Sequence, residues 1–205
     1  MIIEMRTYQL KTRSQAEVLK RFGEALPARL KFSPLGGFFY TDVGALNRII
    51  HLWPYANLAE REHIRAEAVK PGGWPPKIGE FIETMEAKIL IPAPFSPPLE
   101  PRQLGGIYEF RSYIYKPGSM PQVIASWGEA IGERTKLSPL VGAWYSELGP
   151  LNQWVHVWAY KDAGERQRIR EEAVKRGIWP PKGSGELLVS QENLLAMPAS
   201  FSPLR

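Results

Sequence analysis

The sequence predicts an α+β protein made of two ferredoxin-like units, each with the order β-α-β-β-α-β, packed against each other sheet to sheet. Three observations lead to this prediction: an internal repeat along the 205-residue chain, the order of apolar periodicities in each repeat, and a sheet face that carries large aromatic and charged side chains. A unit of roughly 100 residues is long enough to bury a core of its own.

The repeat is visible at a fixed offset. Lys31 to Tyr40 (KFSPLGGFFY) aligns with Lys136 to Tyr145 (KLSPLVGAWY). Towards the end of each repeat, Gly72 to Lys77 (GGWPPK) aligns with Gly177 to Lys182 (GIWPPK). A tandem duplication accounts for matches this long, and it predicts that the two units form an internal pseudo-dimer.

Each repeat closes on a proline-rich stretch, PAPFSP in the first and PASFSP in the second. The second stretch stands where nothing has to be linked, so we assign it to the unit itself. The predicted organisation is a first unit over residues 1–97, a connector rich in proline and glycine over 98–106, and a second unit over 107–205.

A strand and a helix open the unit. Ile2 to Leu10 alternates and is rich in β-forming residues, which is typical of a strand. Ser14 to Leu26 places its apolar residues at helical spacing. We expect a kink or a helix boundary at Pro27, which aligns with Gly132, because proline and glycine both weaken a helix interior.

Two further strands, a second helix and a last strand complete the unit. Gly37 to Asp42 and Arg48 to Trp53 are predicted strands joined by a turn at Gly44. A charged helix follows and ends near Lys70, and Phe81 to Ile91 is the last strand, with a helical turn at its start.

The second helix has a clear start signal in both repeats. Asn57 is followed by Glu60, and Asp162 by Glu165. An Asn or Asp side chain caps free backbone N–H groups, and a glutamate in the first turn suits the helix dipole.

The charge pattern argues against a nucleic-acid partner. The chain has 26 basic and 21 acidic side chains, a net charge of +5, and they are mixed along its whole length. A nucleic-acid protein would more often gather basic residues in a run or stripe. The sequence therefore predicts a mildly basic surface and no nucleic-acid partner.

The chain contains no cysteine, which excludes disulfides, thiolate metal sites and cysteine nucleophiles. No apolar run approaches the ~20 residues that span a bilayer, and no signal region precedes the first strand. We therefore expect a cytoplasmic protein without a membrane span.

Strand alternation defines the candidate site. Ile50 and Leu52 share a face that suits covering helices, which leaves the His51 and Trp53 face for the other unit. Aromatic side chains mixed with Arg and His suit a cavity between two sheets. The candidate ligand-binding residues of this central pocket are Arg6, Tyr8, Tyr40, His51, Trp53, Arg111, Tyr113, Tyr145, His156 and Trp158.

A structural interpretation of the same residues stays open beside it. Glu4 with Arg6, and its copy in the second unit, would then be structural ion pairs. The histidines His51 and His156 would be hydrogen-bonded core residues beside packed tryptophans. A duplicated chain retains core residues as readily as functional residues, so their recurrence fits both interpretations.

Neither a metal nor a cofactor is predicted. Only one histidine per unit is duplicated, and no H-x-H or HExxH spacing, phosphate loop or nucleophile elbow occurs. Arg61 and Arg65, like Arg166 and Arg170, stand four apart on a helix and could grip an anion. Interleaved glutamates favour a solvated helix face instead.

Several stretches resemble one known family. Gly44 to Tyr55 (GALNRIIHLWPY), Leu58 to Arg61 (LAER), Met85 to Leu90 (MEAKIL) and Phe95 to Pro97 (FSP) resemble the NIPSNAP family across the first unit, and the second unit is similar more loosely. The resemblance implies a ferredoxin-like domain of the dimeric α/β-barrel class, so an intramolecular pseudo-dimeric α/β barrel is expected. It implies no settled activity.

Two hypotheses of function follow. The first is a non-catalytic module that binds a small molecule or a protein partner, with a homo-oligomer left open. The second is a cofactor-independent enzyme, similar to the monooxygenases and isomerases of that barrel class, with His51 or His156 as base and Arg6 or Arg111 holding an anion.

Overall fold

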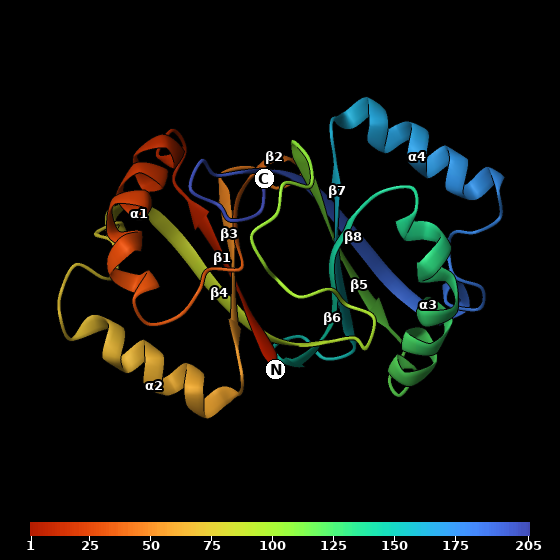
Figure 1. Ribbon diagram of the computed structural model, residues 1–205, viewed down its shortest axis with the longest axis horizontal. Helices are drawn as coiled ribbons and strands as arrows, with labels where there is room; N and C mark the ends of the chain where they lie inside the picture. Colours follow the sequence, from red (N-terminus) through yellow and green to blue (C-terminus); the bar gives the residue numbers. More distant parts are fainter.

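The computed structural model describes residues 1–205 and shows strands that close into one barrel (Figure 1). The helices of each half cover the outside of that half, at opposite ends of the molecule. This confirms the predicted fold class. The main elements are, in order, β1 (Ile2–Leu10), α1 (Gln15–Leu30), β2 (Gly37–Val43), β3 (Arg48–Tyr55), α2 (Leu58–Val69), β4 (Ile82–Pro92), β5 (Ile107–Tyr115), α3 (Met120–Thr135), β6 (Leu140–Leu148), β7 (Gln153–Tyr160), α4 (Ala163–Lys175) and β8 (Leu188–Pro198).

The barrel closes through the edge strands of the two halves. Each half has the strand order of a ferredoxin-like sheet, β4-β1-β3-β2 and β8-β5-β7-β6, with antiparallel neighbours. β2 pairs with β8, and β4 pairs with β6. Each half therefore satisfies the edge hydrogen bonds of the other, and no edge strand is left open.

The expected boundary at Pro27 is wrong, because α1 continues to Leu30. Arg29, beyond the proline, donates from Nη1 to Ser33 Oγ at 2.8 Å and from Nη2 to Tyr55 Oη at 2.9 Å. These tertiary contacts hold the last turn of the helix although Pro27 removes one of its backbone hydrogen bonds.

The predicted starts of the second helices are confirmed. Asn57 Oδ1 accepts a hydrogen bond from the Glu60 backbone N–H at 2.9 Å, and Asp162 Oδ1 accepts one from the Glu165 N–H at 2.7 Å. Each cap fixes the helix that lies over the third strand of its unit.

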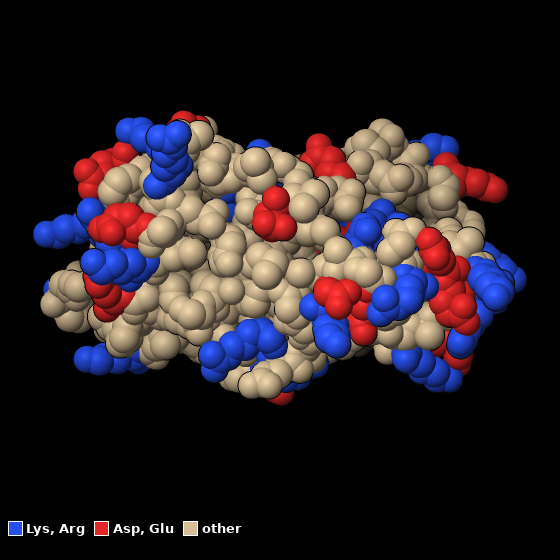
Figure 2. Space-filling model, turned by 90° about the horizontal axis from the view of Figure 1, so that it is seen from above, with Lys and Arg blue, Asp and Glu red and all other residues tan.

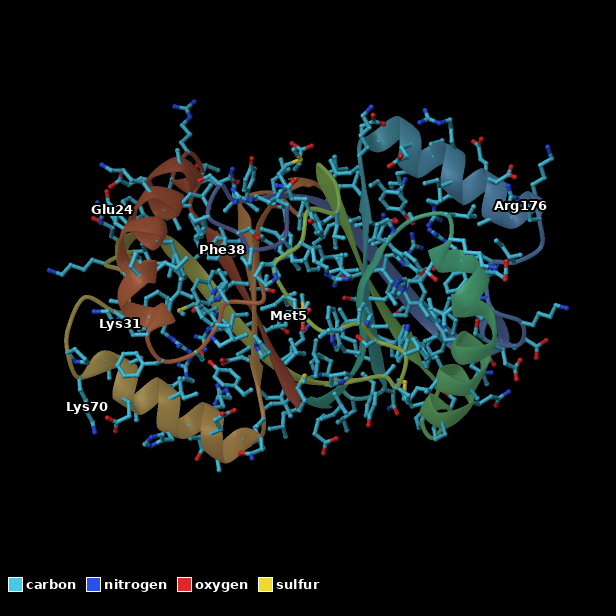
Figure 3. All side chains as sticks on the ribbon, viewed as in Figure 1. Met5, Glu24, Lys31, Phe38, Lys70 and Arg176 are labelled. Atoms are coloured by element: carbon cyan, nitrogen blue, oxygen red, sulfur yellow. The ribbon has the colours of Figure 1, made fainter.

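The strands alternate as predicted, but their two faces point the opposite way. Ile50 and Leu52 belong to the barrel interior together with Met5, whereas Trp53 belongs to the core beneath the helices. Figure 3 shows Met5 between the two sheets and Phe38 beneath α1. The physical reason is that apolar side chains of both units fill the barrel interior, whereas the charged side chains of the strands form ion pairs with residues of the helices.

The barrel interior is a packed core to which both units contribute. It is made of apolar side chains, and its buried members are Ile3, Met5, Phe39, Ile50, Leu52, Leu90, Tyr108, Phe110, Val141, Trp144, Val155, Val157, Ala159, Ala196 and Leu204. Leu99 and Leu104, between the two repeats, pack against this core. Burial of this apolar area is the main force that holds the units together.

Charged side chains gather at the two helical ends of the molecule, and the face between them in Figure 2 is largely uncharged. No helix has the length and apolar character to cross a membrane.

Candidate functional site

The structure brings four of the predicted residues together in each unit, beneath the helices instead of between the sheets. In the second unit Arg111 and Tyr113 of β5 lie beside His156 and Trp158 of β7. The prediction of a single central pocket is therefore wrong, because the side chains that were expected to face the other unit face α3 and α4. Two equivalent sites exist, one per unit.

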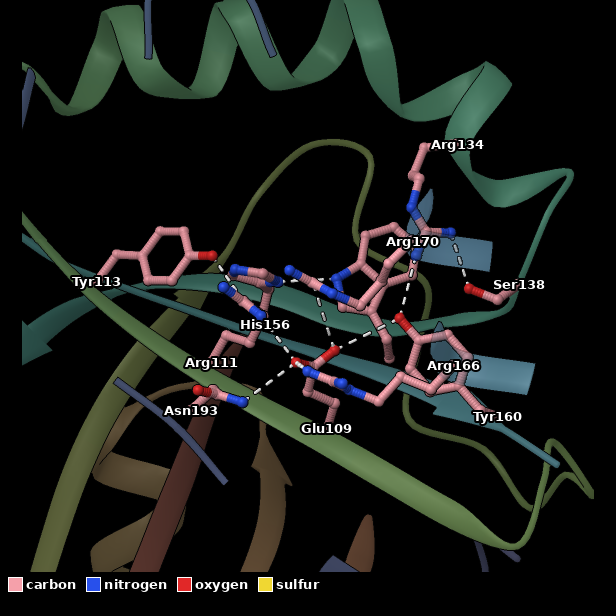
Figure 4. Close-up of polar contacts among 11 residues, drawn as sticks. Glu109, Arg111, Tyr113, Arg134, Ser138, His156, Tyr160, Arg166, Arg170 and Asn193 are labelled. Atoms are coloured by element: carbon pink, nitrogen blue, oxygen red, sulfur yellow. Dashed lines mark hydrogen bonds and ion pairs between the residues drawn. The ribbon is translucent and has the colours of Figure 1, made fainter. Parts of the chain in front are cut away.

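A buried carboxylate lies at the base of the second-unit site (Figure 4). Glu109 is fully buried. Its Oε1 accepts hydrogen bonds from Arg111 Nη1 at 2.7 Å and from Arg166 Nη2 at 2.6 Å. Arg170 Nη1 lies 3.8 Å from its other oxygen, and Asn193 Nδ2 donates at 3.3 Å. Burial by itself raises the pKa of Glu109, but the arginines outweigh it and the net pKa is lowered, so the carboxylate stays ionised.

The first unit repeats this arrangement around Glu4. Its carboxylate accepts from Arg6 Nη1 at 2.9 Å and from Arg61 Nη2 at 2.6 Å, and Arg65 Nη1 lies 3.7 Å away. The pKa of Glu4 is likewise lowered, against the effect of burial, by these arginines. The predicted ion pair of Glu4 with Arg6 is present. The solvated face predicted for Arg61 and Arg65 is wrong for Arg61, which reaches inward from α2, whereas Arg65 is exposed as predicted although it lies near Glu4.

A fourth arginine in each unit has no carboxylate of its own. Arg134 donates to Ser138 Oγ at 2.8 Å and to Tyr160 Oη at 3.1 Å, and its guanidinium lies 4.1 Å from the centre of the Trp158 ring. Burial lowers the pKa of Arg134 from its ordinary value, although an arginine stays charged in any case. Arg29 occupies the same place in the first unit.

We call these groups the first-unit cluster and the second-unit cluster. Each combines four arginines with one glutamate and so carries a net charge of +3; the members are Glu4, Arg6, Arg29, Arg61 and Arg65, and Glu109, Arg111, Arg134, Arg166 and Arg170. Of the 26 basic and 21 acidic side chains, the clusters hold eight and two. The remaining 18 and 19 nearly cancel, so the positive excess of the protein is concentrated at these two places.

The histidine of each site is buried and neutral. His156 Nδ1 accepts a hydrogen bond from Trp158 Nε1 at 2.8 Å, and His51 Nδ1 accepts one from Trp53 Nε1 at 2.6 Å. Burial lowers the pKa of both histidines well below its ordinary value, and the nearby arginines lower it further. Because Nδ1 accepts, the single proton of the neutral ring is assigned to Nε2.

That Nε2–H donor is the unusual feature of the histidines. In both units Nε2 is buried and has no hydrogen-bond partner in the protein. Buried polar groups are nearly always satisfied, so this unpaired donor is available to an acceptor from outside the chain. The expectation of a core histidine beside a packed tryptophan is met at Nδ1 and not at Nε2.

A pocket of about 670 Å³ opens in front of the second-unit cluster. Arg111 and His156 reach it from the sheet, Arg134 from α3 and Arg170 from α4, and Glu171 and Lys175 of α4, which carry opposite charges, also line it. The apolar wall is formed by Trp158, Trp179, Pro180 and Val174. A cavity of this size with apolar walls and a few convergent donors is the usual form of a small-molecule site.

The equivalent pocket of the first unit is smaller, about 230 Å³. Arg6, Tyr8, His51 and Trp53 all line it, as predicted for a common pocket, together with Arg29 and Arg65. Its outer wall includes Met85, where the second-unit pocket has Gln191. The two pockets are built alike but differ in the space they enclose.

Tyr40 and Tyr145 do not belong to either pocket. Tyr40 lies in a hollow between α1 and the end of β8, and Tyr145 in one beside the start of α3. The barrel does have a cavity of about 420 Å³ between the units, but residues such as Arg48, Lys88 and Glu192 line it in place of the predicted set.

Sequence reasoning missed two pairs of site residues, Arg29 with Arg134 and Trp74 with Trp179, and favoured a solvated helix face over an anion site for a third pair, Arg65 with Arg170. All three pairs recur at the offset of the repeat, and this recurrence was the available signal. The chain brings no three metal-binding side chains together.

Comparisons with known proteins identify the family and the fold. The sequence model of the NIPSNAP family matches residues 3–97 and 108–203. The human protein NipSnap homolog 3A is 31% identical, with 98% of this chain and 85% of that protein covered. The NipSnap homolog of Dictyostelium discoideum is 31% identical, with 87% and 78% covered. A monooxygenase-like protein of Fusobacterium nucleatum has a similar structure, with a TM-score of 0.70 at 11% identity over 97% of this chain and 92% of that one.

Proposed function

The chain belongs to the NIPSNAP family, and from this premise we propose that it is a non-catalytic module that binds a small molecule between a sheet and its covering helices. The residues that form the site recur in each unit, and the pocket in front of them is larger in the second unit. The proposal concerns the pockets beneath the helices and makes no use of the barrel interior, which is largely filled by apolar side chains.

One observation carries the proposal: His156 lines the pocket, and its Nε2 is buried without a partner in the protein. Leaving a buried donor without an acceptor costs on the order of 1–3 kcal/mol. A ligand acceptor at this position removes that cost, so the pocket is organised to be occupied. His51 repeats the feature in the first unit.

The geometry gives less support to the enzyme hypothesis, in which His51 or His156 acts as a base. A base needs a free nitrogen lone pair, and the lone pair of Nδ1 is already taken by a tryptophan N–H in both units. The lowered pKa of both rings also makes them weak bases. The histidines are set to donate a hydrogen bond to a ligand.

Native mass spectrometry of the purified protein, compared with its denatured mass, tests the proposal. We expect an extra mass that is released on denaturation. Val174→Trp places a large side chain over the second-unit pocket and should abolish the extra mass, whereas Val189→Trp, at an exposed position of β8 outside the pocket, should retain it. A bare mass in all three proteins, or an extra mass that persists in Val174→Trp, would contradict the proposal.

A further inference from the structure

We propose that the second-unit pocket selects an organic anion, a single carboxylate or sulfonate group carried on a flat apolar body. The inference rests on the proposed function and names the chemical class of its ligand. It stands on three observations: an uncompensated positive charge at the base of the pocket, donors without partners, and aromatic walls with room for more than an inorganic ion.

The charge is the first observation. Three of the four arginines in the second-unit cluster contact the one buried carboxylate and Arg134 contacts none, and Arg134 and Arg111 are themselves largely buried. Buried charges in proteins are normally paired, because removing an ion from water costs several kcal/mol that a partner has to offset. Glu109 can offset one of the four positive charges. An anionic ligand would reduce the remaining excess, and a cationic one would increase it.

The donors are the second observation. His156 offers Nε2–H, and Arg111 uses only Nε and Nη1, towards Tyr113 and Glu109. Arg170 makes no hydrogen bond within the protein, and it extends from α4 at the mouth of the pocket. Planar guanidinium groups match the paired oxygens of a carboxylate or sulfonate, so these donors favour an oxyanion.

The walls are the third observation. The rings of Trp158 and Trp179 lie 5.7 Å apart between centres, and Val174 at the rim is 64% exposed. An inorganic anion would leave this apolar surface unused. Sites of organic ligands usually enclose roughly 300–1,000 Å³. The second-unit pocket, at about 670 Å³, lies within this range, and the first-unit pocket, at about 230 Å³, lies below it. The second unit is thus the site for an organic ligand.

Two fluorescent probes with the same aromatic body test the inference. 8-Anilinonaphthalene-1-sulfonate carries a sulfonate, and N-phenyl-1-naphthylamine lacks it. Titration of the purified full chain with each probe is followed by fluorescence, and far- and near-ultraviolet circular dichroism verifies that every variant is folded. The variants are Arg170→Gln in the pocket and Arg176→Gln, which lies just after α4 and pairs with Glu172 on the exposed side.

We expect the sulfonate to bind with a stoichiometry of one per chain and at least tenfold more tightly than the neutral probe. Arg170→Gln should weaken sulfonate binding at least tenfold, since it removes a charge-assisted hydrogen bond, and should leave the affinity for the neutral probe unchanged. Arg176→Gln should change neither affinity.

Other outcomes separate the two proposals. If both probes bind equally and Arg170→Gln has no effect on either, the preference for an anion is wrong while a binding pocket remains supported. If neither probe binds to the folded protein, both the anion preference and the small-molecule pocket are contradicted. Sulfonate binding at many sites, unaffected by Arg170→Gln, would also overturn the inference because it would report a nonspecific surface.

Discussion

The two pockets share their charged base but differ in the space in front of it. Glu4 and Glu109 are held by equivalent arginines at almost the same distances, and both histidines make the same bond to a tryptophan. The cavities nevertheless enclose about 230 Å³ and 670 Å³. The charge clusters tolerate little change because each buried carboxylate has several partners, whereas a pocket wall can change one side chain at a time.

The aromatic side chains beneath the helices also differ between the two units. In the second unit Trp127 replaces Phe22 of the first, and the ring of Trp179 lies 4.6 Å from it, against 5.4 Å between Phe22 and Trp74. Met85 of the first pocket corresponds to Gln191 of the second. One half of a duplicated chain can therefore enclose a small pocket while the other encloses a larger one, without any change in the members of the two clusters.

The shared base predicts large and equal losses of stability in the two units. Glu4→Gln and Glu109→Gln each remove a fully buried carboxylate from the arginines paired with it, so we expect each to lower the free energy of unfolding by about 3–5 kcal/mol. Urea unfolding at neutral pH measures the effect. A loss below ~1 kcal/mol in one unit only would show that the two bases are not equivalent.

The histidines predict a pH dependence that each unit contributes equally. Because the folded pKa of His51 and His156 is depressed, the unfolded chain binds more protons below its own pKa of about 6.5, and stability falls as the pH is lowered from there. Each ring contributes up to about 1.4 kcal/mol per pH unit.

Substitution separates these two contributions. His51→Gln and His156→Gln should each remove about half of the difference in pH slope that the double variant shows, measured by urea unfolding between about pH 5 and 7. Unequal slopes would mean that one histidine is more accessible to protons than its 1% exposed surface indicates.

A smaller effect is expected from the tryptophans that bond these rings. Trp53→Phe and Trp158→Phe remove the N–H that His Nδ1 accepts, at a cost of about 1 kcal/mol each. The freed Nδ1 should then share the proton with Nε2, which ¹⁵N NMR of the imidazole reports directly. Unchanged ring signals in either variant would contradict the assignment of the proton to Nε2.

The helix caps should give the smallest difference between the units. Asn57→Ala removes a cap and should cost about 1 kcal/mol of stability, and Asp162→Ala removes the equivalent cap. Asp162 also carries a negative charge at the positive end of α4, so its replacement should lower the melting temperature more at low salt than at high salt. Thermal unfolding at low and high salt tests this, and an Asn57→Ala effect that depends more on salt would reverse the expectation.

Much of this protein follows from the sequence by itself. The repeat, the order of the elements, the caps at Asn57 and Asp162, and the sets of side chains that share a strand face all follow from local periodicity and propensity. The family resemblance is confirmed by the match of the NIPSNAP family model to both units. The association of Arg6, Tyr8, His51 and Trp53 in one site is likewise visible from alternation in two strands.

Only the tertiary structure decided which way those faces point and how large each pocket is. Alternation shows that His51 and Ile50 lie on opposite faces, but it is symmetric and cannot show which one faces the helices. That choice depends on Arg61 and Arg65, which reach Glu4 from α2 across 57 and 61 positions of the sequence. Pocket volume depends on how side chains from several elements pack together, so it appears only once the chain has folded.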